Sequence, residues 1–329
     1  MAAPSLIMRA RAGCVLITLL ACFPGTAFAS TTSGRTVEAY LLRMQKMLFT
    51  VNYRGIIVFQ HNTMLKAIAI THGEAPFGGW ERISTLNGPP RELVKNGHRL
   101  ELLFEGHPVR LMHVLAHYTG LPENWVGFSG HFSHTLLREY RFFLLPKRGR
   151  VADHAARIIL IRPDDRFRYG YRLWLDARNG FPLRSDLLND RGQVIEQMMF
   201  VTVHWYGRQQ WHARPPTVPR VAARARRLAV VIPECRFVRL PRGFRIVEDT
   251  TALVPGPVRH ILLSDGLASV SVFIHPIRPK TPTLVGMARM GPVTAFGKKI
   301  GPFSLVAIGE VPPRTVRWII DQARLVTRP

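Results

Sequence analysis

Cysteine is scarce in this chain of 329 residues. Only three cysteines occur, and two of them, Cys14 and Cys22, lie near the N-terminus in a segment that resembles an export signal. If that segment is removed, Cys235 remains alone. The mature chain can then form no intrachain disulfide, and it has too few thiolates for a structural zinc site.

Acidic side chains are also few. Asp and Glu number 21 against 45 Lys and Arg, which gives a formal net charge of +24 at pH 7. A surplus of this size favours contact with polyanions. For an exported protein we expect no nucleic acid partner but anionic lipid head groups, lipopolysaccharide phosphates or acidic partner segments. A generally arginine-rich proteome is the alternative explanation.

Motifs that carry catalysis are missing as well. His113 and His117 would share one face of a helix, and His131 and His134 follow, but no His-Glu-x-x-His arrangement supplies a general base. Ser129 does not lie in a Gly-x-Ser-x-Gly turn.

The adjacent acids Asp164 and Asp165 are better explained by a turn at Pro163 than by a catalytic pair, because a strand would send them to opposite faces. Neither a Walker nor a dinucleotide-binding glycine motif is present. The sequence therefore indicates a binding protein rather than an enzyme, with no cofactor and no metal. An envelope hydrolase is the alternative.

The N-terminal segment has the layout of a signal peptide. Arg9 and Arg11 precede an apolar stretch from Gly13 to Phe23, which is too short to span a membrane. The small-x-small pattern Ala27-Phe28-Ala29 follows. We predict a cleaved signal peptide over residues 1–29 and a periplasmic protein.

Two other fates of this segment remain open. It could stay uncleaved as a membrane anchor, or Cys22 could become the first residue of a lipoprotein, although Leu20 fits that signal poorly. No later segment offers the roughly 18 uninterrupted apolar residues of a membrane-spanning helix.

The mature chain divides into two β-rich units joined by a basic linker. Residues 211–229 are rich in Pro and Arg and lack an apolar period, so they separate a domain at 30–210 from one at 230–329. The linker arginines that could contact anionic lipid or an acidic partner are Arg220, Arg224, Arg226 and Arg227. A solvated spacer is the alternative.

The first unit begins with helical spacing over Thr36–Phe49 and continues from Tyr53 as strands separated by Asn-Gly and other tight turns. This pattern predicts an antiparallel meander. A second helix is expected over Pro108–Thr119, and alternation from Phe167 to Leu175 predicts a further strand.

The second unit contains a predicted hairpin, in which Val258–Leu263 and Ala268–His275 flank Ser264-Asp265-Gly266. Ser304–Gly309 reads as another strand and Thr315–Val326 as a helix after two prolines. The fold class is therefore α+β and β-rich.

A sheet that leaves part of its apolar face open could hold a lipid. The strand residues that could line such a groove are Ile57, Phe59, Tyr169, Tyr171 and Leu173. Ordinary core packing is the alternative explanation for each of them.

Several motifs, in order from Val37 to the C-terminus, resemble the MucB/RseB family. They are Asn52–Gly55, Val58–His61, Ile70–His72, Glu81–Arg82, Leu86–Glu92, Phe167–Asp176, Pro182–Leu188, Ser264–Ile274 and Gly309–Pro312. The longest are Phe-Arg-Tyr-Gly-Tyr-Arg-Leu-Trp-Leu-Asp and Ser-Asp-Gly-Leu-Ala-Ser-Val-Ser-Val-Phe-Ile. Glu101–Pro108 departs from the family pattern, and Met287–Ile300 follows it only loosely.

The resemblance implies a LolA-like N-terminal half-barrel of antiparallel strands with helices on its concave side, and a smaller partner-binding C-terminal domain that ends in a helix. It further implies a periplasmic negative regulator of a sigma-E/AlgU-type stress response. Such a regulator binds a membrane anti-sigma factor of the RseA/MucA type, shields it from the site-1 protease, and is released by lipopolysaccharide or another lipid.

The family signature in the second unit supplies the partner-binding candidates: Ser264, Asp265, Gly266, Leu267, Ser269, Ser271 and Phe273. A lipid or lipoprotein carrier without a signalling role is the alternative function. The oligomeric state is left open, with a homo-oligomer among the alternatives.

Overall fold

The computed structural model describes residues 34–74, 79–96, 99–104, 107–109, 136–216, 232–253, 257–279 and 283–326. Several predictions fall outside these ranges: the signal peptide, the helix at Pro108–Thr119, Ser129, the histidines His113, His117, His131 and His134, and the linker arginines Arg220, Arg224, Arg226 and Arg227.

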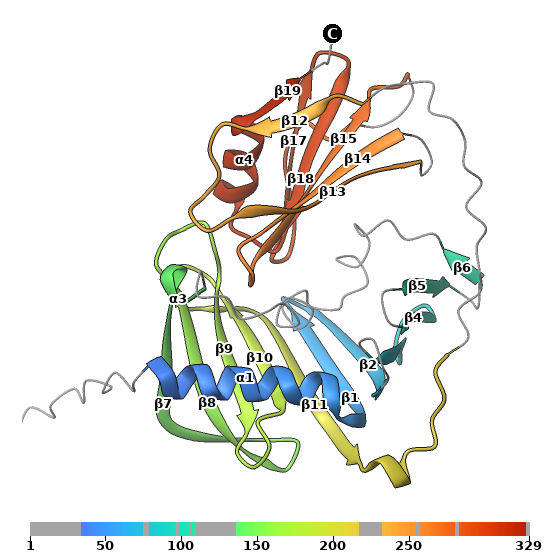
Figure 1. Cartoon of the computed structure of the whole chain (residues 1–329), viewed down its shortest axis with the longest axis vertical. Helices are drawn as coiled ribbons and strands as arrows, with labels where there is room; N and C mark the ends of the chain where they lie inside the picture. Colours follow the sequence, from blue (N-terminus) through green and yellow to red (C-terminus); the bar gives the residue numbers. More distant parts are fainter. Residues whose placement is uncertain are drawn as a thin grey trace, which may run out of the picture. The chain divides into compact units, whose positions relative to one another are not determined.

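An antiparallel sheet of eleven strands forms the first part of the fold, in the order β6-β5-β4-β3-β2-β1-β11-β10-β9-β8-β7 (Figure 1). Its strands are β1 (Asn52–His61), β2 (Met64–Gly73), β3 (Trp80–Thr85), β4 (Arg91–Asn96), β5 (Arg99–Phe104), β6 (His107–Val109), β7 (Tyr140–Val151), β8 (His154–Pro163), β9 (Gly170–Asp176), β10 (Pro182–Leu188) and β11 (Val194–Tyr206). Two meanders, β1–β6 and β7–β11, join where β1 pairs with β11.

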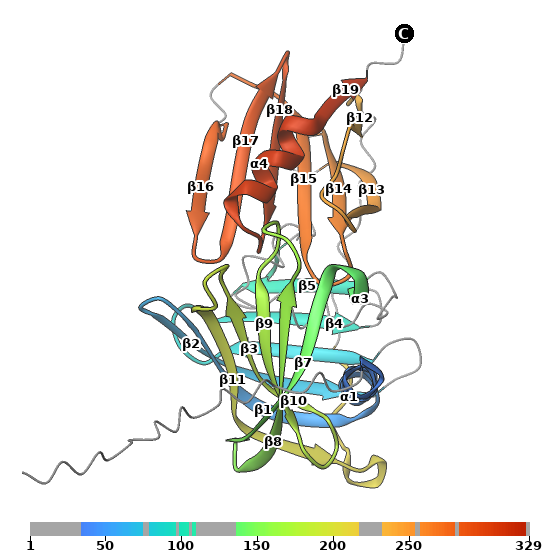
Figure 2. The same ribbon diagram turned by 90° about the vertical axis from the view of Figure 1, so that its left-hand side faces the viewer.

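Helix α1 (Gly34–Thr50) packs on this sheet (Figures 1 and 2). Its buried residues Val37, Leu41, Met44 and Leu48 recur at helical spacing and share one core with the sheet. The predicted helix at Thr36–Phe49 is confirmed. The short helix α3 (Leu136–Glu139) leads into β7, and the 3-10 turn η3 (Arg208–Gln210) follows β11.

The second part of the chain forms a six-stranded antiparallel sheet in the order β13-β14-β15-β18-β17-β16 and a separate pair β12-β19. The bounds are β12 (Glu234–Phe237), β13 (Arg245–Leu253), β14 (Pro257–Ser264), β15 (Ser269–Pro276), β16 (Gly286–Met290), β17 (Val293–Ile300), β18 (Phe303–Gly309) and β19 (Ala323–Val326). Helix α4 (Pro313–Gln322) buries Val316, Ile319 and Ile320 in the core of this sheet.

The predicted α+β, β-rich class is confirmed, with a large antiparallel sheet under a helix and a smaller sheet that carries a helix near the C-terminus.

The packing of Trp211 adds a detail at the start of the predicted linker. This side chain contacts Trp80 and Tyr206, and the guanidinium of Arg54 lies 5.4 Å from its ring centre. The domain limits themselves stay predictions.

Strand β7 was not predicted, for two physical reasons. Its pairing with β8 shifts register between Leu145 and Arg148, and this irregularity accommodates Pro146, which has no amide hydrogen for the ladder. Its turn into β8 uses Ala152 and Asp153 at φ of 49° and 66° rather than Asn-Gly.

Two predicted boundaries were wrong. The strand expected from Phe167 begins at Gly170, because the preceding residues form a turn that carries the buried side chain of Arg168. The helix expected to reach Val326 ends at Gln322, because Ala323–Val326 pairs with β12 as a strand.

Gly291 in the β16–β17 turn tests a contact between the two sheets. Its φ is 67°, and a Cβ there would overlap the His61 imidazole at the end of β1. Gly301 in the next turn has φ of 55° and open space. We expect Gly301→Ala to lower the free energy of unfolding by about 1–2 kcal/mol through backbone strain. Gly291→Ala should lower it by roughly 1–3 kcal/mol more than Gly301→Ala does, because the new methyl group also overlaps His61. Urea denaturation measures both, and equal losses would contradict the contact.

Candidate functional site at the junction of the two sheets

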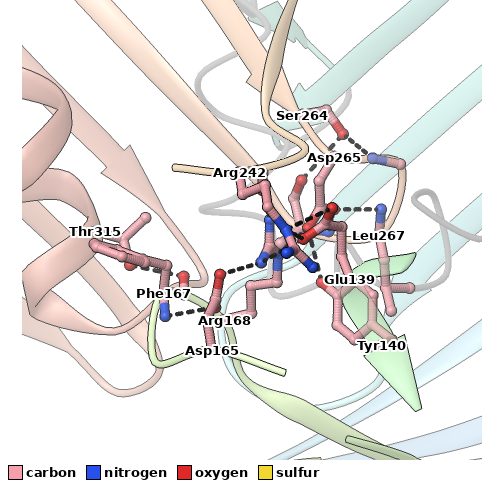
Figure 3. A network of polar contacts seen from close by, with 12 residues as sticks. Glu139, Tyr140, Asp165, Phe167, Arg168, Arg242, Ser264, Asp265, Leu267 and Thr315 are labelled. Carbon is pink, nitrogen blue, oxygen red and sulfur yellow. Dashed lines mark hydrogen bonds and ion pairs between the residues drawn. The ribbon is translucent and has the colours of Figure 1, made fainter. Parts of the chain in front are cut away.

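Arg168 lies in the turn between β8 and β9, and its side chain is completely buried. The guanidinium reaches both sheets (Figure 3). Nε donates to the Asp265 carboxylate, and Nη1 donates to Asp165. Nη2 donates to the backbone carbonyl of Arg242, and Glu139 lies 3.8 Å from Nη1. One arginine therefore contacts groups in its own turn and in three other segments of the chain.

Asp265 connects the second sheet to this arginine. It lies in the β14–β15 turn, where its Oδ1 accepts from the backbone amides of Leu267 and Ala268 at 2.9 and 2.8 Å. Its Oδ2 accepts from Arg168 and from the Tyr140 hydroxyl, the latter at 2.9 Å. The carboxylate thus fixes its own turn and holds it against β7 and the β8–β9 turn.

Arg242 forms a second ion pair next to the one between Arg168 and Asp265. Its Nε donates to both oxygens of Glu139 at 3.1 and 2.9 Å, and its Nη2 donates to the carbonyl of Arg138 at 2.9 Å. Gly243 follows at φ of 83°, and a Cβ there would lie 2.8 Å from Cγ of Glu139. Only glycine combines that backbone conformation with so close an approach.

The charges of the cluster stabilise one another. Burial by itself lowers the pKa of Arg168, but Asp265 and the Tyr140 oxygen raise it, and the pKa ends above its ordinary value. Burial also raises the pKa of Tyr140 well above its usual range, so its hydroxyl stays protonated and donates to Asp265. A buried charge is tolerated when its partners satisfy it in this way.

Further contacts flank the cluster. The Thr315 hydroxyl in α4 donates to the Phe167 carbonyl at 2.7 Å, and the Phe167 and Trp318 rings meet edge to face with centroids 5.6 Å apart. Leu267 from the β14–β15 turn is buried in the core of the first sheet. The two sheets therefore share apolar as well as ionic contacts.

Two buried carboxyl groups add a pH-sensitive element, Glu196 on β11 and Glu310 after β18. Burial, followed by the charge of Glu310, raises the pKa of Glu196 to about 9. Burial raises the pKa of Glu310 to about 7, and its Oε2 is buried without a hydrogen-bond partner among the described residues. The pair is therefore most stable when protonated.

In the described part of the chain, the other titratable and nucleophilic side chains form neither a metal-binding nor a reactive site. No cluster of three or more His, Cys, Asp or Glu residues within those ranges is arranged to hold a metal ion. Cys235 is a buried free thiol, and burial raises its pKa to about 11. Among the same residues, no helix has the length and apolar character of a membrane span.

Comparison with known protein families identifies the family of the chain. The MucB/RseB N-terminal domain matches residues 36–219, and the MucB/RseB C-terminal domain matches residues 233–324. The chain belongs to the MucB/RseB family. The resemblance inferred from the sequence motifs is confirmed.

Individual relatives of this family member match over most of their length. The sigma factor AlgU regulatory protein MucB of Pseudomonas aeruginosa is 26% identical over 314 residues, covering 88% of this chain and 90% of the relative. The sigma-E factor regulatory protein RseB of Escherichia coli K12 is 23% identical over 318 residues, covering 94% and 96%. The MucA/MucB complex structure from P. aeruginosa matches with a TM-score of 0.65 and 26% identity, covering 89% of this chain and 100% of that one.

The five predicted lipid-groove residues lie together in the structure. Ile57, Phe59, Tyr169, Tyr171 and Leu173 all belong to the buried core that the first sheet shares with α1, and each is at most 7% exposed. Core packing accounts for this burial. Lipid binding at these positions stays a prediction, and it would require the core side chains or α1 to move.

The predicted partner-binding residues lie along the β14–β15 hairpin. Ser264 and Gly266 bond to each other within the turn, and Ser269 begins β15. The Ser271 hydroxyl lies 3.0 Å from Nε2 of His260, whose ring stacks on Phe273. Asp265 and Leu267 are engaged with the first sheet. Contact with another protein at these seven positions stays a prediction.

Sequence reasoning missed Arg168, Glu139 and Arg242 as a cluster. In the alternating run from Phe167, Arg168 falls among the interleaved residues and reads as solvent-facing. Its burial depends on Asp265, which is 97 positions away in the sequence. The position of Arg168 directly between Phe167 and Tyr169 was the one available signal.

Removal of Arg168 tests the ionic cluster. Arg168→Ala leaves Asp265 buried without a positive partner, and we expect the free energy of unfolding to fall by about 3–5 kcal/mol. The control is Arg141→Ala, because Arg141 pairs with Asp164 at 2.7 Å but is 72% exposed, so its loss should stay under about 1 kcal/mol. Urea denaturation followed by tryptophan fluorescence measures both. Similar losses in the two variants would contradict a structural role for the buried pair.

The buried carboxyl groups of Glu196 and Glu310 predict that the free energy of unfolding depends on pH. Both folded-state pKa values exceed the ordinary 4.5. The protonated pair therefore stabilises the fold fully below pH 4.5, and this contribution is lost as pH rises through about 7 and towards 9. Glu310→Gln removes one titration, so its stability relative to the native chain should increase by roughly 2–3 kcal/mol between pH 5 and pH 8. Denaturation at both pH values checks this. The partly exposed Glu38→Gln is the control, and a pH-independent difference for Glu310→Gln would contradict the assignment.

Proposed function

We propose that this MucB/RseB family member is a periplasmic negative regulator of a sigma-E/AlgU-type envelope-stress response. It binds the periplasmic part of a membrane anti-sigma factor of the RseA/MucA type. The observation that carries the proposal is the match of both family domains in one chain, at residues 36–219 and 233–324. A carrier needs the first domain alone, so the second favours a regulator.

The relatives support the same reading. Those from P. aeruginosa and E. coli are named as sigma factor regulatory proteins. One matching structure is described as MucB in complex with MucA(peri). The predicted signal peptide over residues 1–29 agrees with a periplasmic site of action.

The junction geometry supports a function that requires both sheets in one body. Arg168 and Asp265 would lose their buried partners if the sheets separated, so the intact cluster favours a composite surface over independent domains. A partner segment that crosses both sheets would find its two contact surfaces already aligned. Preorganisation of this kind lowers the entropic cost of binding.

Shielding and release are the finer parts of the proposal. A bound anti-sigma segment is less accessible to the site-1 protease, so the sigma factor stays sequestered. Lipopolysaccharide or another anionic lipid releases the segment if it binds the partner-free state more tightly than the bound one. The linker arginines would attract lipid phosphates, while the apolar core beneath α1 would open to acyl chains.

One experiment tests binding, shielding and release together. The mature chain, residues 30–329, is titrated into the labelled periplasmic segment of the RseA/MucA-type anti-sigma factor from the same organism. We expect saturable one-to-one binding by fluorescence anisotropy, slower cleavage of the bound segment by the site-1 protease, and displacement by lipopolysaccharide.

The control segment has the same composition in scrambled order. Failure to bind the native segment better than this control would overturn the regulator. If lipid binds under those conditions and deletion of the gene mislocalises lipoproteins without activating stress-sigma targets, the carrier function is the correct one.

A further inference from the structure

A cavity of about 290 Å³ lies beside the Arg168 cluster and is lined from both parts of the chain. Arg166 in the β8–β9 turn and Arg191 in the β10–β11 turn line it from the first sheet. Arg289 on β16 and Arg314 in the first turn of α4 line it from the second part. All four side chains are exposed, so their guanidinium groups can meet a ligand from solvent. We call this cavity the arginine pocket.

The positive charge of the arginine pocket is not balanced. Asp190 is the one acidic residue that lines it. Among the ion pairs within the described ranges, none includes Arg166, Arg191, Arg289 or Arg314. Other arginines of the same chain are paired, as Arg172 and Arg184 are with the buried Asp186. Like charges gathered in a concave site favour an anion there.

The backbone around the arginine pocket is well supported. Asn189 caps the β10–β11 turn, because its Oδ1 accepts from the amides of Arg191 and Gln193 at 2.9 and 3.0 Å. The pocket is also lined by Pro312, the N-cap of α4, and by Pro313, its first residue, and the N-terminal end of this helix adds positive potential. The side chain of Tyr169 is buried and accepts a hydrogen bond from Arg289. The arginines therefore extend from ordered positions.

We propose that the arginine pocket binds a phosphate monoester. A guanidinium donates two parallel hydrogen bonds to phosphate oxygens. A monoester carries about −1.5 to −2 charges near neutral pH, so it suits several arginines better than a single carboxylate does. The volume of about 290 Å³ is near the lower limit for small-molecule sites, which fits a phosphorylated sugar or a lipid head group but leaves no room for acyl chains.

The arginine pocket differs from the sites predicted from the sequence. None of its four arginines belongs to the linker, and the buried apolar groove residues contribute only Tyr169 to its wall. The proposal does not depend on anti-sigma binding, because it concerns the protein alone. Since the ligand would contact arginines from both sheets, its binding should also raise the temperature of unfolding.

Calorimetric titration of residues 30–329 with glucose 1-phosphate tests the proposal, with glucose as the uncharged control. We expect one site per chain and no detectable binding of glucose. The double variant Arg289→Gln with Arg314→Gln should weaken binding at least tenfold. The matched control is Arg148→Gln with Arg239→Gln, which removes the same charge from exposed arginines outside the pocket; it should change the affinity less than twofold.

Further binding measurements, with lipid vesicles and with inorganic phosphate, identify which kind of compound carries the phosphate group. Vesicles that contain phosphatidic acid carry a phosphate monoester, whereas phosphatidylglycerol carries a diester. Pocket-dependent binding that prefers the former supports a lipid head group, and binding of inorganic phosphate as tight as that of glucose 1-phosphate supports free phosphate. Equal losses in the two double variants would reduce the effect to net charge and overturn the site. Tighter pocket-dependent binding of a glutamate-rich peptide would overturn the phosphate assignment.

Discussion

The buried ion pair between Arg168 and Asp265 is the interaction on which the relation of the two sheets depends. A charge removed from water requires a partner, and each of these groups finds its partner in the other part of the chain. Asp165 and the carbonyl of Arg242 accept hydrogen bonds from Nη1 and Nη2 of the guanidinium, and Glu139 adds a negative charge 3.8 Å from Nη1. Separation of the sheets would therefore expose an incomplete set of charges, which makes the junction a specific contact rather than a loose one.

This constraint changes the interpretation of the family signature in the second domain. The motif from Ser264 to Ile274 contains the residues expected to meet a partner, yet Asp265 and Leu267 contact the first sheet of the same chain. Its strongest physical role is to build the junction. In the proposed function, a partner would then recognise the surface that the joined sheets create.

The structure divides the many arginine residues of the chain into two groups. Some arginines are paired and partly buried, as at Asp186 and Asp249, and these stabilise the fold. Those of the arginine pocket are exposed and without ion pairs within the described ranges, where they can act on an anion. Composition alone predicts attraction to polyanions in general, whereas the position of each carboxylate decides which arginines remain available.

Local patterns in the sequence were enough to determine the β-rich class, the helix beginning near Thr36, the Ser264–Gly266 hairpin and the family, because spacing and turn chemistry act over a few residues. Strand β7 was missed because its bulge at Pro146 breaks the alternation. The burial of Arg168 and the pairing of Glu196 with Glu310 were decided only by the tertiary structure. Their partners lie about a hundred positions away or more, and only the folded chain removes these charges from water.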